Sequence, residues 1–307
     1  MTSAGHDCPL CGAALGRDAF PYAHEWEGLV YRCRKCTHCS TTAVDPLPDE
    51  ETLARVYDWE RYHTVHYLGP EQAVRHARAL TLLGDLSPRP RTILDFGCGD
   101  GSFLMAAHAA GFACVGLERQ PSTIRATAAR TGLRVIGADE LTAGDESFDV
   151  IHMSDVLGHL PDPAAALIDL ERHLAPRGRF VVDGPLERNR SLVFWVARSS
   201  KLIRRALGAR RVPTAAPTML MRTDLRAQRR FFTNRLGYRE LVLMPYETGW
   251  PYLEPSGSLR APSGVARRCV GQLAVRLADS RFGRRLGMGN RFLGVFEPQR
   301  RSGDSAD

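Results

Sequence analysis

Hydrophobic and polar positions along most of the chain follow two periods. From residue 91 onward, short apolar runs rich in β-branched residues alternate with stretches whose apolar residues recur at helical spacing. We expect seven strands, at residues 92–96, 113–118, 134–136, 149–153, 179–183, 239–245 and 291–297. Helices are expected at residues 101–110, 122–130, 164–174 and 223–236. This alternation favours an α/β fold with a doubly wound, mostly parallel, seven-stranded sheet that is covered on both faces.

The pattern before residue 91 is different. Residues 1–48 are rich in Cys, Gly and Pro and too short to bury a core alone, so they need a staple such as a metal. An acidic first helical turn begins at Asp49, and a second helical stretch covers residues 71–83. We expect a small ribbon at residues 1–48, a helical linker packing on the core at 49–90, the main domain at 91–300 and a disordered tail at 301–307.

Two stretches interrupt the alternation of the main domain, at about residues 186–221 and 252–288. Insertions at such places commonly shape a substrate pocket, so we expect both to form caps. The first is basic and amphipathic, with apolar residues such as Trp195 and Ile203 beside cations such as Arg198. A lid packed on the main domain is the favoured interpretation, and an interfacial membrane helix is the alternative.

Clustered cysteines indicate a metal site in the ribbon. The chain has neither an apolar run of membrane-spanning length nor a signal-peptide pattern, so we expect a cytoplasmic protein, in which clustered thiols favour metal over disulfides. Cys8 and Cys11 have the spacing of a zinc knuckle, whereas Cys33, Cys36 and Cys39 form two overlapping pairs with the same spacing. Spacing alone leaves the second pair open. Four thiolates would close the coordination sphere, which predicts a structural zinc; free or redox-active thiols are the alternative.

The formal charge of +7 and the pI near 9.2 come almost entirely from arginine, with only two lysines. Such a bias is typical of a GC-rich coding sequence. We therefore interpret it as a solvated basic surface, and we do not expect nucleic acid as a partner.

A glycine-rich turn connects the first strand of the main domain to its helix. Gly97, Gly99 and Gly101 let the backbone approach a ligand beside unpaired N–H groups of the helix. A nicotinamide dinucleotide fingerprint would need glycine at Ser102, and Asp95 would repel a pyrophosphate, so a cationic cofactor fits better.

Two further acids lie just beyond successive strand ends. Glu118 is placed to accept hydrogen bonds from a ribose diol, and Asp139 is placed to contact an adenine amino group. Each acid alone is typical of a loop, but together with Asp95 they indicate a cofactor site.

These residues resemble the class I S-adenosylmethionine-dependent methyltransferases, whose fold is Rossmann-like. The similar segments are residues 94–101 for the glycine motif, Glu118 for the ribose acid, 138–139 for the adenine pair, 148–151 and 156–163 for the fourth strand and its loop, and 174–179. The resemblance implies S-adenosylmethionine as cofactor, held by Asp95, Gly97, Gly99, Gly101, Glu118 and Asp139.

The N-terminal part resembles a bacterial subgroup in which a zinc ribbon leads through an Asp-Pro-x-Pro stretch into the methyltransferase domain. There the last cysteine lies one short strand before the Asp-Pro, which matches Cys39 and Asp45. The resemblance therefore implies zinc ligands Cys8, Cys11, Cys36 and Cys39 and leaves Cys33 as the spare thiol. Such enzymes modify sugars, glycans, lipids or secondary metabolites, so we expect O- or C-methylation of an acceptor of this kind.

Candidate catalytic residues follow the fourth strand. A neutral histidine suits proton removal from a hydroxyl or an acidic carbon, and His159 is the candidate, although a role in fixing its loop is the simpler interpretation. Asp155 is a candidate for orienting the cofactor's methionine part or the acceptor. The linker tyrosines Tyr57, Tyr62 and Tyr67 are expected to pack at the interface with the core.

The sequence departs from the family pattern at three places. Gly158 stands where a glutamate is usual before the histidine, Arg177 replaces a glycine, and residues 217–220 lack the His-Leu pair of relatives. Two other function classes remain open. One is an RNA-base methyltransferase, which predicts steeply salt-dependent RNA binding. The other is a non-catalytic cofactor-binding protein whose ribbon contacts a protein partner.

Overall fold

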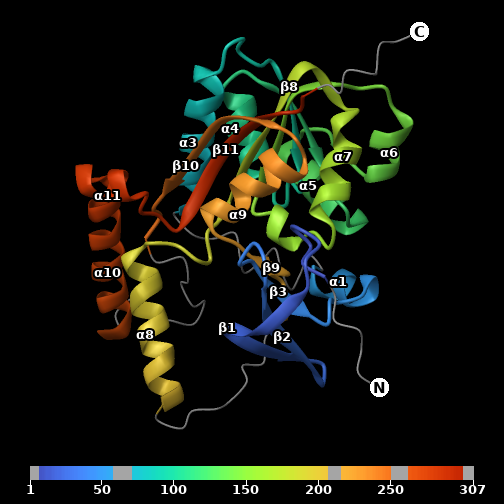
Figure 1. The fold of residues 1–307 in the computed structure, drawn as a ribbon. Coiled ribbons are helices and arrows are strands. Elements are labelled where there is room, and N and C mark those ends of the chain that lie inside the picture. The colour runs from blue at the N-terminus through green and yellow to red at the C-terminus, as the bar shows by residue number, and fades with distance from the viewer. Residues whose placement is uncertain (1–6, 58–70, 207–215, 250–261, 300–307) are drawn as a thin grey trace.

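The computed structural model describes residues 7–57, 71–206, 216–249 and 262–299. In Figure 1 a large sheet flanked by helices lies above a small N-terminal sheet, and a group of helices stands at one side. Tyr62, Tyr67, the expected tail at 301–307 and the first part of the expected cap at 252–288 lie outside the described residues.

The large sheet has seven strands in the order β10-β11-β8-β7-β4-β5-β6. The strands are β4 (Thr92–Phe96), β5 (Ala113–Leu117), β6 (Val135–Ile136), β7 (Phe148–Ser154), β8 (Leu174–Pro185), β10 (Arg239–Tyr246) and β11 (Arg291–Glu297). Neighbours from β8 to β6 pair in parallel, whereas β11 pairs antiparallel with both β8 and β10. The predicted mostly parallel, seven-stranded sheet is confirmed.

Alternating side chains of the central strands pack against two layers of helices. Ile93 packs on one face with α3 (Glu71–Asp85) and α4 (Ser102–Ala109), near α5 (Pro121–Thr131). Leu94 packs on the other face with α6 (Ala138–Ala143) and α7 (Pro163–Glu171). Since adjacent strand residues point to opposite faces, apolar runs at these strands are what a sheet buried on both faces requires.

The small sheet contains a strand from late in the chain. Its order is β1 (Leu15–Trp26), β2 (Leu29–Cys36), β3 (Thr42–Asp45) and β9 (Met221–Arg222), all antiparallel. Helix α1 (Glu50–Val56) follows β3, and the side chain of Asp49 caps it by accepting from the Thr52 N–H. The N-terminal sheet is therefore joined to the main domain by backbone pairing as well as by chain connection.

A helical group stands beside the large sheet (Figure 1). It comprises α8 (Leu192–Ala206), α10 (Pro262–Asp279) and α11 (Arg281–Leu286), with α10 in contact with both of the others. No helix within the described part of the chain is both long and apolar enough to traverse a bilayer.

The expected helix at residues 223–236 differs in detail. It forms α9 (Leu225–Arg230), capped by Asp224, and continues into a π-helical turn, η3 (Phe231–Arg235). The wider turn coincides with two consecutive rings, Phe231 and Phe232, that are both buried in the core.

Candidate active site and cysteine cluster

The glycine turn lies at the carboxyl end of β4, where parallel strands of such sheets present their ligand sites. Gly97, Gly99 and Gly101 all have left-handed φ, at 72°, 52° and 72°. A Cβ on Gly97 would lie 2.6 Å from Val156 Cγ2, and one on Gly101 would lie 2.7 Å from Thr127 Cγ2. Glycine is therefore required at both positions by conformation and by space.

Glu118 follows β5 and is already held against this turn. The Gly99 N–H donates to its Oε2 at 3.1 Å, and the Arg119 N–H donates to its Oε1 at 2.8 Å. Burial raises the pKa of the Glu118 carboxyl, and these two backbone hydrogen bonds lower it in part. Asp139 lies in the first turn of α6 and is exposed. The structure thus brings Glu118 to the glycine turn, as the predicted site requires.

Asp95 is buried within β4 and contacts a histidine. Its Oδ1 lies 2.7 Å from Nδ1 of His152 on the neighbouring strand β7. The His152 ring stacks on Phe103 of α4 with 3.7 Å between centroids, and His76 of α3 meets the same phenyl ring edge-on. One oxygen of Asp95 is therefore engaged in the core, and its part in cofactor binding stays a prediction.

His76 makes stability sensitive to acid. Burial, with the nearby charge of Arg75, lowers the pKa of His76 to about 4 from its ordinary value near 6.5. Between pH 4 and pH 6.5 the unfolded chain binds a proton at His76 that the folded protein does not bind. The contribution of neutral His76 to the free energy of unfolding is therefore complete above pH 6.5 and declines as the pH falls toward 4. We expect His76→Gln to flatten this slope in urea unfolding, with exposed His108→Gln as control; an unchanged slope in His76→Gln would contradict it.

Asp155 lies just beyond β7 at φ 58° and bridges two arginines. Its carboxylate pairs with Arg75 of α3 and, at 2.6 Å, with Nη2 of Arg291 of β11. Arg291 also pairs with the buried Asp183 at the end of β8, and the Tyr246 hydroxyl donates to Asp183. Both oxygens of Asp155 are thus engaged, which makes it part of a charged network that connects α3 with the ends of β7 and β8 and with β11.

His159 is fixed in η2 (Leu157–His159) by partners from two distant segments. Its Nδ1 lies 2.7 Å from the carbonyl oxygen of Thr218 and 2.8 Å from the hydroxyl oxygen of Tyr57. The Tyr57 hydroxyl itself donates to the Thr218 carbonyl at 2.6 Å. Because a carbonyl oxygen only accepts, Nδ1 carries the proton and the lone pair of the neutral ring is on Nε2.

Gly158 departs from the family pattern for a packing reason. A Cβ there would lie 2.5 Å from Met219 Sδ, and the Leu220 N–H donates to the Gly158 carbonyl at 2.9 Å. On its other side Leu220 accepts from the Val44 N–H of β3. The 218–222 segment is therefore held between the loop after β7 and the N-terminal sheet, and a larger residue at 158 would require the Met219 side chain to move.

Four cysteines converge where the segment before β1 meets the turn between β2 and β3. The Sγ atoms of Cys8, Cys11, Cys36 and Cys39 all lie within 4.8 Å of one another. Cys8 and Cys39 sulfurs are 3.6 Å apart, and those of Cys11 and Cys36 are 3.5 Å apart. Zinc–sulfur bonds of about 2.3 Å place tetrahedral ligands at nearly these separations, so the donor set fits one zinc ion.

Cys33 lies away from this cluster. Its side chain is buried with Tyr31 and Val44, and its Sγ lies 3.7 Å from Nη1 of Arg222 of β9. Alternation along β2 places Cys33 and Cys36 on opposite faces, which the spacing of cysteines in the sequence did not reveal.

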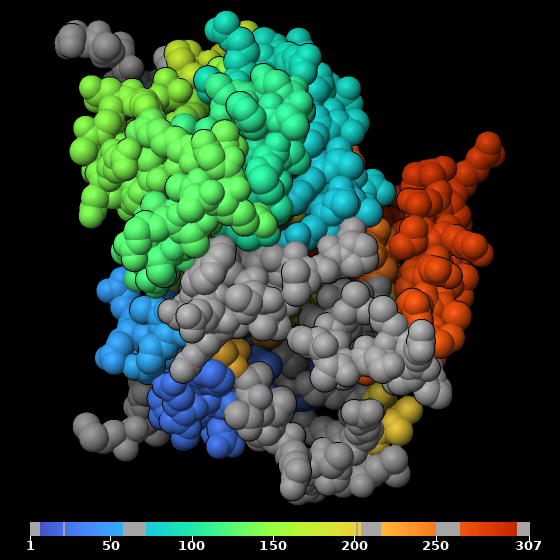
Figure 2. Space-filling view, turned by 180° about the vertical axis from the view of Figure 1, so that it is seen from behind, coloured from blue at the N-terminus to red at the C-terminus, as the bar shows by residue number. Residues whose placement is uncertain are grey.

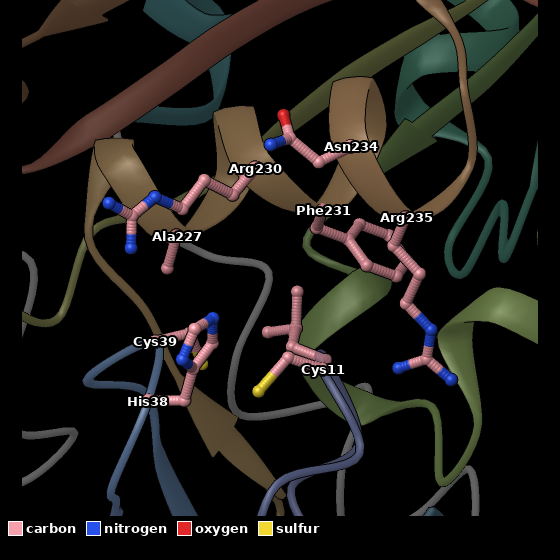
Figure 3. A pocket seen from close by; sticks show the side chains of 9 residues that line it. Cys11, His38, Cys39, Ala227, Arg230, Phe231, Asn234 and Arg235 are labelled. Atoms are coloured by element: carbon pink, nitrogen blue, oxygen red, sulfur yellow. The ribbon is translucent and has the colours of Figure 1, made fainter.

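A shallow pocket of about 440 Å³ lies between the cysteine cluster and the α9–η3 helix. Figure 3 shows Phe231 and Arg235 on the lower side of the helix, with His38 and Cys11 below them. Arg235 donates to the Pro9 carbonyl at 2.8 Å. The pocket is formed by the junction between ribbon and core, and none of the expected cofactor residues lines it.

Two sequence comparisons match parts of the chain. Residues 68–205 match a family model described as a methyltransferase domain. The ubiquinone biosynthesis O-methyltransferase of Cereibacter sphaeroides is 29% identical over 167 residues, which cover 49% of this chain and 67% of that protein. An uncharacterized methyltransferase of Mycobacterium sp. is 36% identical over 101 residues, which cover 32% of this chain and 40% of that protein. The chain thus spans about two thirds of one relative and two fifths of the other.

Solved structures share the fold. A chain of the complex between the Haloferax volcanii methyltransferase activator Trm112 and a methyltransferase is 16% identical, with a TM-score of 0.50. The likeness covers 82% of this chain and 96% of that chain. At this identity the comparison supports the architecture alone.

Proposed function

Since the chain carries an S-adenosylmethionine-dependent methyltransferase domain, we propose that the protein methylates an oxygen, or an acidic carbon, of a small-molecule, sugar, glycan or lipid acceptor. The match to a ubiquinone biosynthesis O-methyltransferase supports a hydroxyl as the acceptor group. The observation that carries the proposal is the hydrogen bond between Nδ1 of His159 and the Thr218 carbonyl, because it prepares a base just beyond β7, which pairs with the strand β4 that leads into the glycine turn.

The cofactor would be held by Asp95, Gly97, Gly99, Gly101, Glu118 and Asp139. When bound, S-adenosylmethionine supplies a methyl group on a positively charged sulfur. Each oxygen of Glu118 accepts one backbone N–H and keeps acceptor capacity for a ribose hydroxyl. The exposed Asp139 suits an adenine amino group at the pocket rim.

His159 would act as the general base. In the tautomer fixed by Thr218, Nε2 accepts the proton of the acceptor hydroxyl as its oxygen attacks the methyl carbon. The ring then becomes positively charged, and the Thr218 carbonyl and Tyr57 oxygen stabilise that charge at Nδ1. The two partners therefore orient the ring and favour its protonated product.

His159→Ala tests this assignment. We expect kcat for transfer of labelled methyl groups to a panel of phenolic, sugar and prenylated quinol acceptors to fall by about 10²–10⁴, the usual range for general-base catalysis. The affinity for S-adenosylmethionine, measured by calorimetry, is expected to stay unchanged. Tyr57→Phe is the matched control, since it keeps the hydrogen bond from Nδ1 of His159 to the Thr218 carbonyl. Its kcat is expected to fall by less than about tenfold. An unchanged kcat in His159→Ala would contradict the base.

Glu118→Gln tests the cofactor site. Losing charge-assisted hydrogen bonds to the ribose is expected to weaken S-adenosylmethionine binding by about 10- to 100-fold in calorimetry. Because the pKa of Glu118 is raised, wild-type affinity is expected to fall on acidification sooner than an ordinary carboxyl would allow, and the variant should lack this fall. Asp169→Asn, which alters an exposed carboxylate on α7, is expected to bind like wild type. Equal binding by all three proteins would exclude the site.

We also propose that Cys8, Cys11, Cys36 and Cys39 bind a structural zinc ion. Four thiolates fill a tetrahedral coordination sphere and leave no position for an acceptor. The Cys36 sulfur additionally lies 3.3 Å and 3.4 Å from the N–H groups of His38 and Cys39, which stabilise a thiolate. The zinc would therefore hold the ribbon together and take no part in methyl transfer.

A further inference from the structure

The positive charge of the protein is concentrated on the helical group α8, α10 and α11. These helices contain ten cations and a single carboxylate, Asp279, which is a net charge of +9. The whole chain is +7, so everything outside these helices is net −2. A basic composition spread evenly over the surface would not give this division, and the helical group therefore has its own electrostatic character.

The same helices expose large apolar side chains. Trp195 and Ile203 of α8 are 53% and 59% exposed, and Phe282 of α11 is 66% exposed. Further exposed apolar residues of the group are Val196, Leu202, Val265, Leu273 and Leu286. Eight of the fourteen exposed large apolar residues of the described chain thus belong to these three helices, so they are not scattered at random.

The exposed apolar residues of α8 form one stripe. Trp195, Leu202 and Ile203 follow one another at intervals of seven and one residues, which places them on one side of a helix. Arg198 lies along the border of this stripe, with its guanidinium carbon 5.9 Å from the Trp195 ring centre. An apolar stripe with cations at its border is the pattern of a helix lying in a membrane interface.

A basic groove opens beside the stripe. About 440 Å³ in volume, it lies where the start of α8 meets the start of α9 and the end of α11. Its lining includes five arginines, of which Arg229 is paired with Glu240, and one acid, Asp224, which is engaged as the cap of α9. Arg188, Arg190, Arg198, Arg226 and Arg229 are the lining arginines. Such a groove suits a phosphate group.

We propose that the face formed by α8, α10 and α11 binds the surface of an anionic phospholipid bilayer. The cations pair with lipid phosphates, while Trp195, Ile203 and Phe282 enter the boundary between headgroups and acyl chains. Figure 1 shows the group at one side of the molecule, and Figure 2 shows α10 and α11 at its edge. Nucleic acid accounts for the arginines but not for the exposed aliphatic residues, and a second copy of so basic a face would repel the first. The inference does not rely on methyl transfer.

Vesicle flotation of the full-length, zinc-loaded protein tests the proposal without cofactor or acceptor. We expect partition onto vesicles of phosphatidylcholine with phosphatidylglycerol, at least tenfold weaker partition onto phosphatidylcholine alone, and release as salt is raised. Ile203→Ser is expected to lower the partition onto anionic vesicles by about tenfold, and the double variant Arg281→Glu with Arg285→Glu is expected to lower it by at least tenfold. Ile168→Ser on α7 is the matched control, because Ile168 is 58% exposed and Ile203 is 59% exposed. It is expected to bind like wild type.

Several outcomes would overturn the proposal. Equal binding to neutral and anionic vesicles would contradict the role of the cations. Equal losses of vesicle binding in Ile168→Ser and Ile203→Ser would contradict the assignment of binding to this face. Light scattering that shows a dimer dispersed by Ile203→Ser would assign the face to a second copy. RNA binding that survives Ile203→Ser, together with no flotation, would assign it to nucleic acid. Thermal unfolding and S-adenosylmethionine calorimetry verify that each variant is folded, which keeps a failure here distinct from a failure of the methyltransferase function.

Discussion

Chelation of zinc is expected to unfold the N-terminal sheet while the seven-stranded sheet stays folded. The hydrophobic cluster within the small sheet consists of Tyr31, Cys33 and Val44, with Trp26 packed against it, and the contact with the main core includes Leu10 and the clustered cysteines. Because much of that contact is made by the cysteines themselves, we expect it not to hold three strands once the metal is removed. Structural zinc contributes about 10–16 kcal/mol of binding free energy in small zinc modules. Removal of the metal is therefore expected to lower the stability of the ribbon by more than a single side-chain substitution there.

Two cysteine variants make this expectation specific. Cys39→Ser should lose bound zinc, measured by elemental analysis, and lose hydrogen-exchange protection in β1, β2 and β3. Cys33→Ser, at a buried cysteine outside the cluster, should retain zinc. Binding of S-adenosylmethionine should persist in both variants. If Cys33→Ser loses zinc and Cys39→Ser keeps it, the ligand set is wrong.

Arg291→Met is expected to destabilise the main domain by about 3–5 kcal/mol, the usual cost of removing one partner of a buried ion pair. The change leaves Asp183, which is 2% exposed, without its cation. Asp155 would keep only Arg75. Urea unfolding followed by circular dichroism measures the loss.

A second substitution separates electrostatics from packing. Adding Asp183→Asn to Arg291→Met removes the uncompensated charge and is expected to restore part of the lost stability. Arg172→Met breaks an exposed pair with Asp169 on α7 and is expected to cost less than about 1 kcal/mol. A loss in Arg291→Met no larger than in Arg172→Met would show that the network contributes little.

Most of the large sheet could be predicted because both faces of its strands are buried. Runs such as Ile93-Leu94 and Val181-Val182 supply apolar side chains to both helical layers, so the signal in the sequence is strong. The 12-residue strand β1 was not predicted, because its sequence lacks the regular alternation of apolar and polar residues that indicates a strand. Its partner β2 and the cysteine cluster, rather than its own apolar pattern, determine its conformation.

The candidate site was predictable only where its residues are close in sequence. The glycine turn and Glu118 follow successive strands, and strand order alone brings them together. The partners of His159 could not be found in this way, because Tyr57 is 102 residues before it and Thr218 is 59 residues after it. Likewise, no local pattern connects Asp155 with Arg291, which is 136 residues away.

Strand β9 gives the protein an order of assembly during synthesis. Thr42 and Ala43 of β3 leave the ribosome well before Arg222 and Met221, their partners on one edge. At about 5–20 residues per second, that edge stays open for roughly 10–40 s. An open strand edge is a place where another nascent chain can pair, so shielding by chaperones should matter most in this interval. The ribbon begins to fold first, yet its sheet is complete only after most of the methyltransferase domain has been made.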